Sequence, residues 1–219
     1  MTTTIPLSGP MLPPKSGTPA KQLMVLLHGY GADGRDLISL GGEWRDDFPD
    51  MLFVSPNAPW QCGRNAGGFE WFPLSDRPAE DFRREGADIA RPVIVNFLID
   101  LWAQTGLTAR DTVLCGFSQG AMMALHVALS LDQPVRGVVA FSGALIPPPG
   151  EWARPPVALI HGDRDGVVPV QFSIDADAAL RAKGVDSMLH ISPGSAHGIA
   201  PAGLAFAGQF LAAKMGSIA

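Results

Sequence analysis

The sequence predicts a doubly wound α/β fold, in which a mostly parallel central sheet is covered by helices on both faces. Short runs of β-forming residues recur along the chain, several of them are continuously apolar, and longer helical segments separate them. Continuously apolar strands suit a sheet that is buried on both faces, because a half-exposed strand would alternate polar and apolar residues. Regular alternation of strand and helix predicts that neighbouring strands run parallel.

The expected elements follow one another in a fixed order. Strands are predicted at residues 23–27, 52–55, 112–115, 137–141, 157–160 and 188–191. Helices are predicted at residues 36–46, 84–104, 119–131, 170–183 and 199–215. Pro92 should kink the second helix or mark its start, because proline has no N–H to donate to the preceding turn.

A length of 219 residues suits one domain. We expect a Pro-rich leader over residues 1–20 and a single domain over residues 21–219. Residues 143–157 are too few to fold as a cap over the sheet edge, so an open and shallow site is expected. Cys62 and Cys115 lack the spacing of a zinc site or a disulfide framework, and both are expected to be free thiols.

Composition excludes several classes of protein. With 47% hydrophobic and 17% charged residues, the chain has the composition of a globular protein and not that of a disordered or collagen-like one. A net charge of -5 argues against a nucleic-acid partner. The sequence shows no signal peptide, and no apolar run approaches the roughly 18 residues of a membrane span. We therefore expect a cytoplasmic protein without stable membrane insertion.

The most informative segment is Gly-Phe-Ser-Gln-Gly at residues 116–120, between a predicted strand and a predicted helix. Glycines two positions before and after a serine allow a turn too sharp for a Cβ atom, as in a nucleophile elbow. Such a turn would lift the Ser118 hydroxyl from the carboxyl edge of the sheet and point the next helix at it. The structural alternative is a glycine-rich turn with an N-cap serine.

A nucleophilic serine requires a base and a carboxylate, which follow it in this fold in the order Ser, Asp, His. His197 lies in a glycine-flanked loop after the last predicted strand. Asp163 and Asp165 both lie in the loop after the preceding strand, and position alone does not choose between them. The remaining histidines are expected to be structural or solvent-facing: His28, His126, His161 and His190.

Acyl transfer also requires an oxyanion hole, made of two N–H groups that face the oxygen on which charge develops. The N–H of Gln119 is the first expected donor because it follows the serine. The second should come from the glycine-rich loop at residues 28–34, after an early strand. This loop lacks the Gly-Lys-Ser/Thr ending of a phosphate-binding loop.

Four motifs resemble those of the phospholipase/carboxylesterase family of α/β-hydrolases, which includes acyl-protein thioesterases and small bacterial carboxylesterases. They are Leu-His-Gly-Tyr-Gly at 27–31, Gly-Phe-Ser-Gln-Gly at 116–120, His-Gly-Asp-Arg-Asp-Gly-Val-Val-Pro at 161–169 and Ala-His-Gly at 196–198. The resemblance implies an α/β-hydrolase fold without a cap domain. It further implies Ser118 as nucleophile, His197 as base, Asp165 as carboxylate and the backbone N–H of Tyr30 as second oxyanion donor.

The same resemblance suggests a substrate pocket. Trp71 corresponds to a family stretch that borders the acyl group, and Phe141 to a strand end facing the same pocket; ordinary aromatic packing is the alternative for Trp71. We expect a serine carboxylesterase that hydrolyses short to medium chain acyl esters, without cofactor or metal, and the resemblance allows a homodimer. The alternative is an acyl-protein thioesterase or a lysophospholipase. A non-catalytic receptor is disfavoured because no triad position is replaced.

Overall fold

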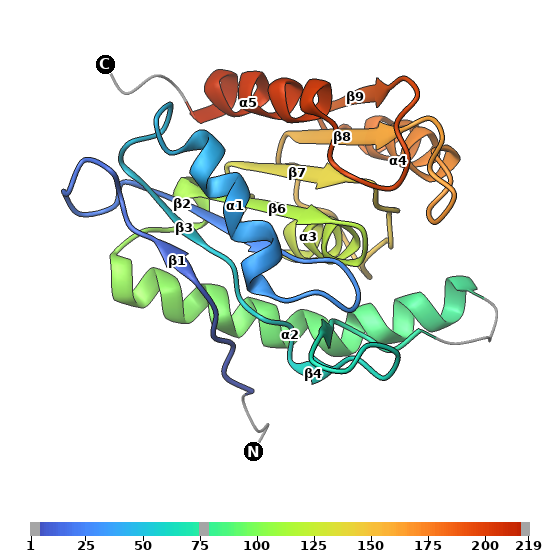
Figure 1. Ribbon diagram of the computed structural model, residues 1–219, viewed down its shortest axis with the longest axis horizontal. Helices are drawn as coiled ribbons and strands as arrows, with labels where there is room; N and C mark the ends of the chain where they lie inside the picture. Colours follow the sequence, from blue (N-terminus) through green and yellow to red (C-terminus); the bar gives the residue numbers. More distant parts are fainter. Residues whose placement is uncertain (1–4, 75–78, 216–219) are drawn as a thin grey trace.

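The computed structural model describes residues 5–74 and 79–215, which form one seven-stranded sheet with helices on both faces (Figure 1). In spatial order the strands are β1 (Met11–Leu12), β3 (Met51–Val54), β2 (Gln22–Leu27), β6 (Thr112–Phe117), β7 (Gly137–Phe141), β8 (Val157–Gly162) and β9 (Ser187–Ser192). Six of them are parallel, and only β1 pairs antiparallel with its neighbour β3. The carboxyl ends of the parallel strands therefore share one edge, at the right in Figure 1.

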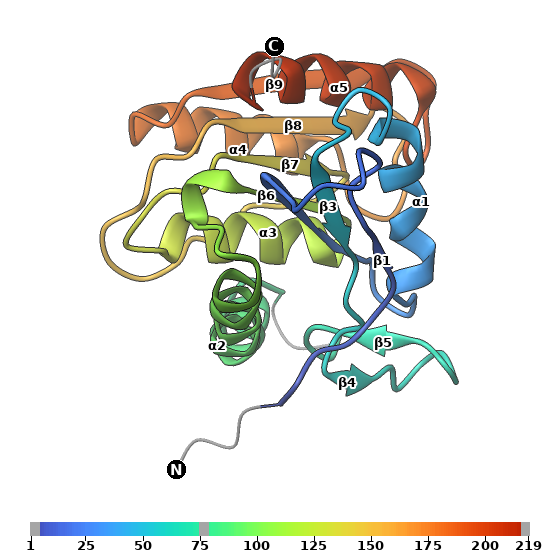
Figure 2. The same cartoon turned by 90° about the vertical axis from the view of Figure 1, so that its left-hand side faces the viewer.

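The helices form two layers (Figure 2). One face of the sheet is covered by α1 (Gly34–Trp44) and α5 (Pro201–Met215), and the other by α2 (Ala79–Thr105), α3 (Gln119–Ser130) and α4 (Gln171–Ala182). In β2, Leu23 and Val25 pack into the core on the α2 and α3 side, whereas Met24 and Leu26 pack on the α1 side. Burial on both faces explains the continuously apolar strands, and it confirms the predicted fold class.

All six predicted strands and five predicted helices are present, with boundaries that differ by a few residues. Pro92 lies inside α2 and does not mark its start. Three short strands were not predicted: β1, and the antiparallel pair of β4 (Trp60–Gln61) and β5 (Phe69–Glu70). Each has two residues, which is too short to show a period. A 3₁₀ helix, η1 (Ala109–Asp111), precedes β6.

Two further features bear on function. β1 comes from the predicted Pro-rich leader, so part of that segment forms an edge strand of the sheet. Residues 143–156, which connect β7 to β8, contain neither a helix nor a strand and form no cap. Among the helices that the structure describes, none has the length and apolarity to cross a membrane.

Candidate active site

Ser118 occupies the sharp turn between β6 and α3, at the carboxyl edge of the sheet. Its backbone has φ 53° and ψ -117°, a conformation that costs a residue with a side chain about 1–3 kcal/mol. The flanking glycines are required by space. A Cβ on Gly116 would lie 2.3 Å from the carbonyl oxygen of Gly120, and one on Gly120 would lie 1.9 Å from the carbonyl oxygen of Leu27. The structure thus has the geometry expected of a nucleophile elbow.

Ser118, His197 and Asp165 form a continuous chain of hydrogen bonds. The Ser118 Oγ lies 3.1 Å from Nε2 of His197, and Nδ1 of His197 lies 2.6 Å from Oδ2 of Asp165. The side chain of Asp165 is fully buried, whereas that of His197 is 19% exposed. A buried acid, an imidazole and an accessible hydroxyl in this order can pass a proton from the serine to the imidazole.

Backbone groups hold the carboxylate of Asp165. Its Oδ1 accepts hydrogen bonds from the N–H groups of Val167 and Val168, both at 2.8 Å. Burial alone would raise the pKa of Asp165, but the hydrogen bonds from His197, Val168 and Val167 outweigh it and hold the pKa below its ordinary value. The group is therefore an anion at neutral pH and an acceptor only.

The structure separates the two aspartates that sequence position left equal. Oδ1 of Asp163 accepts a hydrogen bond from the N–H of Gly194 at 2.6 Å, so this side chain holds the loop before His197 and not the imidazole itself. Only Asp165 reaches His197. The two carboxylates, although two residues apart in one loop, face different partners.

The other histidines also have defined surroundings. Nδ1 of His161 lies 2.6 Å from Ser173 Oγ, and Nδ1 of His126 lies 3.0 Å from the carbonyl oxygen of Ile146. The ring of His190 stacks on that of Phe206, with centroids 5.0 Å apart. His28 is buried at the start of the glycine-rich loop, and its Nδ1 lies 2.8 Å from the carbonyl oxygen of Gly29.

The glycine-rich loop and the start of α3 place Tyr30 and Gln119 at the same edge as Ser118. Within the described residues, the backbone N–H of Tyr30 donates to no protein acceptor, whereas that of the next residue, Gly31, donates to the carbonyl oxygen of Phe69 at 2.9 Å. The Tyr30 hydroxyl has other contacts: burial, followed by hydrogen bonds with Cys62 and Glu70, raises its pKa. The phenol therefore stays neutral at physiological pH.

A network of side-chain hydrogen bonds, which the sequence did not reveal, joins the start of α3 to the glycine-rich loop. Oε1 of Gln119 accepts from the N–H of Trp71 at 2.9 Å, and Nε2 of Gln119 donates to the carbonyl oxygen of Phe72 at 2.7 Å. The indole Nε1 of Trp71 donates to the carbonyl oxygen of His28 at 2.9 Å. Gln119 thus holds the residue 71–72 segment, which in turn holds the loop that carries Tyr30.

Both residues predicted to wall the substrate pocket lie beneath the surface. The side chains of Trp71 and Phe141 are 0% exposed, so a substrate would touch either ring only after the covering atoms moved. Trp71 instead hydrogen-bonds to Gln119 and to the carbonyl oxygen of His28. Phe141 belongs to the core on the α1 and α5 side. Their role as pocket walls stays a prediction.

A cavity of about 450 Å³ opens at the carboxyl edge of the sheet. It is lined by residues 144–147, which follow β7, and by residues of α2 and α4. α4 itself follows the loop that carries Asp165. Ala144, Ile146 and Ala176 contribute apolar wall, and the guanidinium of Arg83 lies 5.4 Å from the centre of the Phe172 ring.

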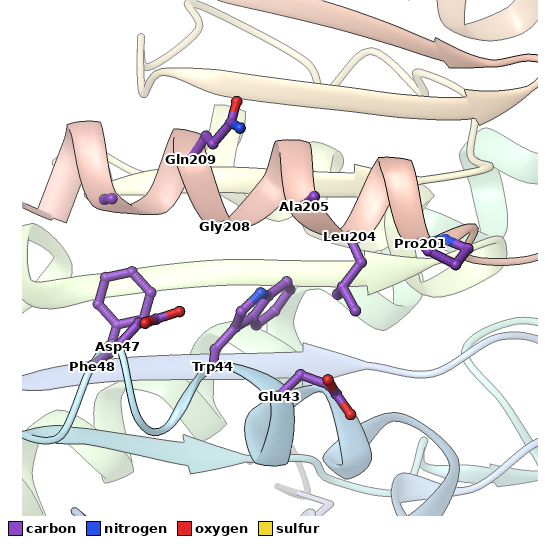
Figure 3. Close-up of a pocket in the computed structure, with 10 residues that line it drawn as sticks. Glu43, Trp44, Asp47, Phe48, Pro201, Leu204, Ala205, Gly208 and Gln209 are labelled. Atoms are coloured by element: carbon purple, nitrogen blue, oxygen red, sulfur yellow. The ribbon is translucent and has the colours of Figure 1, made fainter.

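Another cavity, of about 590 Å³, lies between α1 and α5 and includes Trp44, Phe48 and Leu204 in its wall (Figure 3). Ser118 and His197 are among the lining residues of neither cavity. The cavity beside residues 144–147 borders α4, which follows the Asp165 loop, whereas this one lies between α1 and α5. Among the residues the structure describes, no group of three or more His, Cys, Asp or Glu side chains is placed to hold a metal ion.

Comparison with known proteins identifies the family. A family model described as Phospholipase/Carboxylesterase matches residues 14–215. The chain belongs to the phospholipase/carboxylesterase family. This confirms the resemblance seen in the sequence motifs.

Relatives of the chain include esterases. The chain is 32% identical over 191 residues to Esterase YpfH of Escherichia coli, covering 86% of this chain and 81% of that protein. It is 30% identical over 179 residues to Acyl-protein thioesterase 1 of Saccharomyces cerevisiae, covering 72% and 76%. The crystal structure of esterase PE8 superposes with a TM-score of 0.92 at 55% identity, covering 95% of this chain and 99% of that one. The protein is a carboxylic ester hydrolase, and its substrate is an ester.

Proposed function

We propose that the protein is a serine carboxylesterase that hydrolyses short to medium chain acyl esters through an acyl-enzyme intermediate. The observation that carries the proposal is the unbroken chain from Ser118 Oγ through His197 to Asp165, with distances of 3.1 and 2.6 Å. We expect the reaction to need no cofactor or metal ion.

In the first half-reaction, Ser118 Oγ attacks the carbonyl carbon of the ester while Nε2 of His197 takes the hydroxyl proton. The carbonyl electrons move onto oxygen, where the N–H groups of Gln119 and Tyr30 bind the oxyanion. Collapse of this intermediate breaks the bond to the alcohol, which leaves with the proton from His197. Water then repeats the sequence on the acyl-enzyme and releases the acid.

Asp165 accepts the Nδ1–H of His197 throughout and stabilises the imidazolium that forms in each half-reaction. Its lowered pKa supports this role, because a carboxyl group that remained protonated could not accept that hydrogen bond. The positive φ of Ser118 supports the nucleophile assignment, since such strain is typical of functional turns.

For the acyl group we propose the cavity of about 450 Å³ beside residues 144–147. Its volume lies within the range of about 300–1,000 Å³ typical of small-molecule sites. Apolar walls from Ala144, Ile146 and Ala176 suit an alkyl chain.

An acyl-protein thioesterase or a lysophospholipase is the alternative, because the same five groups would cleave a thioester or a lysolipid. The similarity to an acyl-protein thioesterase of yeast favours keeping it as the second candidate. The cytoplasmic location and the homodimer are expectations from the sequence and from the family.

Two measurements test the proposal. A fluorophosphonate probe should label Ser118 in the wild-type protein and not in Ser118→Ala, with the site located by mass spectrometry. A panel of p-nitrophenyl esters and acyl thioesters of matched chain length should show higher kcat/KM for the short and medium esters. Absence of labelling would reject the serine mechanism, and a preference for long-chain thioesters would favour the alternative.

A further inference from the structure

The peptide between Gly29 and Tyr30 is held from its carbonyl side. The carbonyl oxygen of Gly29 accepts the N–H of Ala32 at 3.2 Å and lies 2.8 Å from Nδ1 of His28. The structure contains no cis peptide bond among the described residues, so the Gly29 C=O and the Tyr30 N–H point in opposite directions across one planar unit. Whatever fixes this carbonyl therefore also fixes the direction of the Tyr30 N–H.

The hydrogen bonds of His28 define which ring nitrogen carries the proton. The N–H of Ala58 donates to Nε2 at 2.9 Å, so Nε2 must be without a proton. In the neutral ring the proton is then on Nδ1, which donates it to the Gly29 carbonyl oxygen. Burial lowers the pKa of His28 and outweighs the opposite effects of Gly29, Asp33 and Asp36. The ring is 0% exposed, and both of its nitrogens have partners.

The segment on either side of this peptide is also fixed. The carbonyl oxygen of His28 accepts from Trp71 Nε1, and the N–H of Gly31 donates to the Phe69 carbonyl oxygen. The peptide itself lies between two glycine positions, 29 and 31, and Gly31 has φ 77°. Half a turn of this peptide changes ψ of residue 29 and φ of residue 30, and glycine at position 29 leaves the first of these angles free. Such a turn would direct the Gly29 oxygen toward the oxyanion and the Tyr30 N–H away from it.

We propose that His28 is a positioning residue, whose Nδ1–H holds the Gly29 carbonyl so that the N–H of Tyr30 faces the oxyanion. The inference rests on the proposed serine esterase function, in which Tyr30 supplies an oxyanion donor. His28 does not touch the substrate. It acts through the Gly29–Tyr30 peptide, and it determines whether the Tyr30 N–H already faces the oxyanion position, together with the Gln119 N–H, before the ester binds.

A pair of variants separates the two hydrogen bonds of the ring. In His28→Asn the side-chain N–H₂ can take the place of Nδ1 and donate to Gly29, but nothing replaces Nε2. In His28→Gln the side-chain oxygen can take the place of Nε2 and accept from Ala58, but nothing replaces the Nδ1 donor. His190→Gln is a matched control, because His190 packs on Phe206 at a distance from the loop.

Loss of one oxyanion donor costs about 10²–10³ in kcat. We expect His28→Gln to lower kcat by about 10²-fold with little change in KM, and His28→Asn and His190→Gln to stay within a few-fold of wild type. A trifluoromethyl ketone, which accepts Ser118 Oγ at its carbonyl carbon and becomes an oxyanion, should lose affinity for His28→Gln by the same factor. Equal losses of kcat in Asn and Gln variants, or a change in KM alone, would overturn the proposal.

A measurement on the unmodified protein covers the case in which the His28 variants do not fold. Long-range ¹H–¹⁵N spectra of ¹⁵N-histidine-labelled protein should show the His28 ring with the proton on Nδ1 and a bare Nε2. A proton on Nε2 would overturn the inference. The fluorophosphonate reaction of Ser118 is independent of this result, so wild-type labelling together with an Nε2 proton would reject the role of His28 and leave the esterase mechanism standing.

Discussion

His161 shares an acceptor with His197, because its Nε2 lies 3.2 Å from the same Oδ2 of Asp165 that accepts the His197 Nδ1–H. His161 Nε2 is closer to the carbonyl oxygen of Val168, at 2.7 Å, which places its proton between the two oxygens. Since the N–H groups of Val167 and Val168 hold the other oxygen of Asp165, donors reach the carboxylate on both sides. The acid is thus fixed by its own loop as well as by His197.

Replacing Ser118 by alanine should lower kcat by about 10⁶-fold, because the nucleophile is lost. The fold should persist, since His197 is the one hydrogen-bond partner of the side chain among the described residues and the hydroxyl contributes little to packing. Ester hydrolysis and the melting temperature measured on the same preparation would check this. Retention of more than a few per cent of the activity in pure protein would contradict the assignment.

Asp165→Asn should lower kcat by about 10⁴-fold, because an amide can favour the wrong tautomer of His197. Asp163→Asn is the matched control from the same loop. This change removes the negative charge from the acceptor of the Gly194 N–H, so it should change thermal stability more than kcat. Steady-state kinetics give kcat for both variants. A larger loss of kcat in Asp163→Asn than in Asp165→Asn would assign the role of the acid to Asp163.

Much of this site can be predicted from the sequence, because its motifs describe backbone requirements. Gly116 and Gly120 are needed where a Cβ would meet backbone atoms, and that need is visible as a pattern around the serine. The choice between Asp163 and Asp165 is different, because it depends on how one loop turns. Residue position alone does not show which carboxylate faces His197, and only the family resemblance indicated it.

Other contacts were beyond prediction for a physical reason. The side-chain amide of Gln119 donates to the carbonyl oxygen of Phe72, 47 residues earlier. Every residue has such a carbonyl oxygen, so the identity of residue 72 gives no sign of the bond. Neither composition nor period marks such a partner. His28 was expected to be structural or solvent-facing, and its hydrogen bonds to Gly29 and Ala58 became visible only in three dimensions. The strands β1, β4 and β5 are too short to produce a pattern.

The pH dependence of kcat/KM should come from His197 and not from Asp165. Protonated His197 cannot accept the Ser118 proton, so kcat/KM should rise along a single limb as His197 loses its proton. Asp165 should add no limb near neutral pH, because its pKa is held below the ordinary value. A second limb that disappears in Asp165→Asn would contradict this.

The lowered pKa of Asp165 also predicts that the folded protein loses stability in acid. A carboxyl whose folded-state pKa is depressed contributes stability above its unfolded pKa of about 3.9, and this contribution is lost as pH falls through the folded value. The free energy of unfolding, measured by urea titration at a series of acidic pH values, should therefore fall less steeply in Asp165→Asn than in wild type. Asp163→Asn is the matched control from the same loop, and it should keep the wild-type slope.

Acyl chain preference should respond to the volume of the cavity beside residues 144–147. Ala179 lies in its wall on α4, and Ala179→Phe should fill part of the space and move the preferred ester toward shorter chains. A methylene contact is worth about 1–3 kcal/mol, so the preference should shift gradually along the ester series. Ala178→Phe, at an exposed position on the same helix, is the matched control and should leave the profile unchanged. If both variants keep the wild-type profile while folded, the acyl chain binds elsewhere, and Trp71→Ala then tests the predicted wall at that residue.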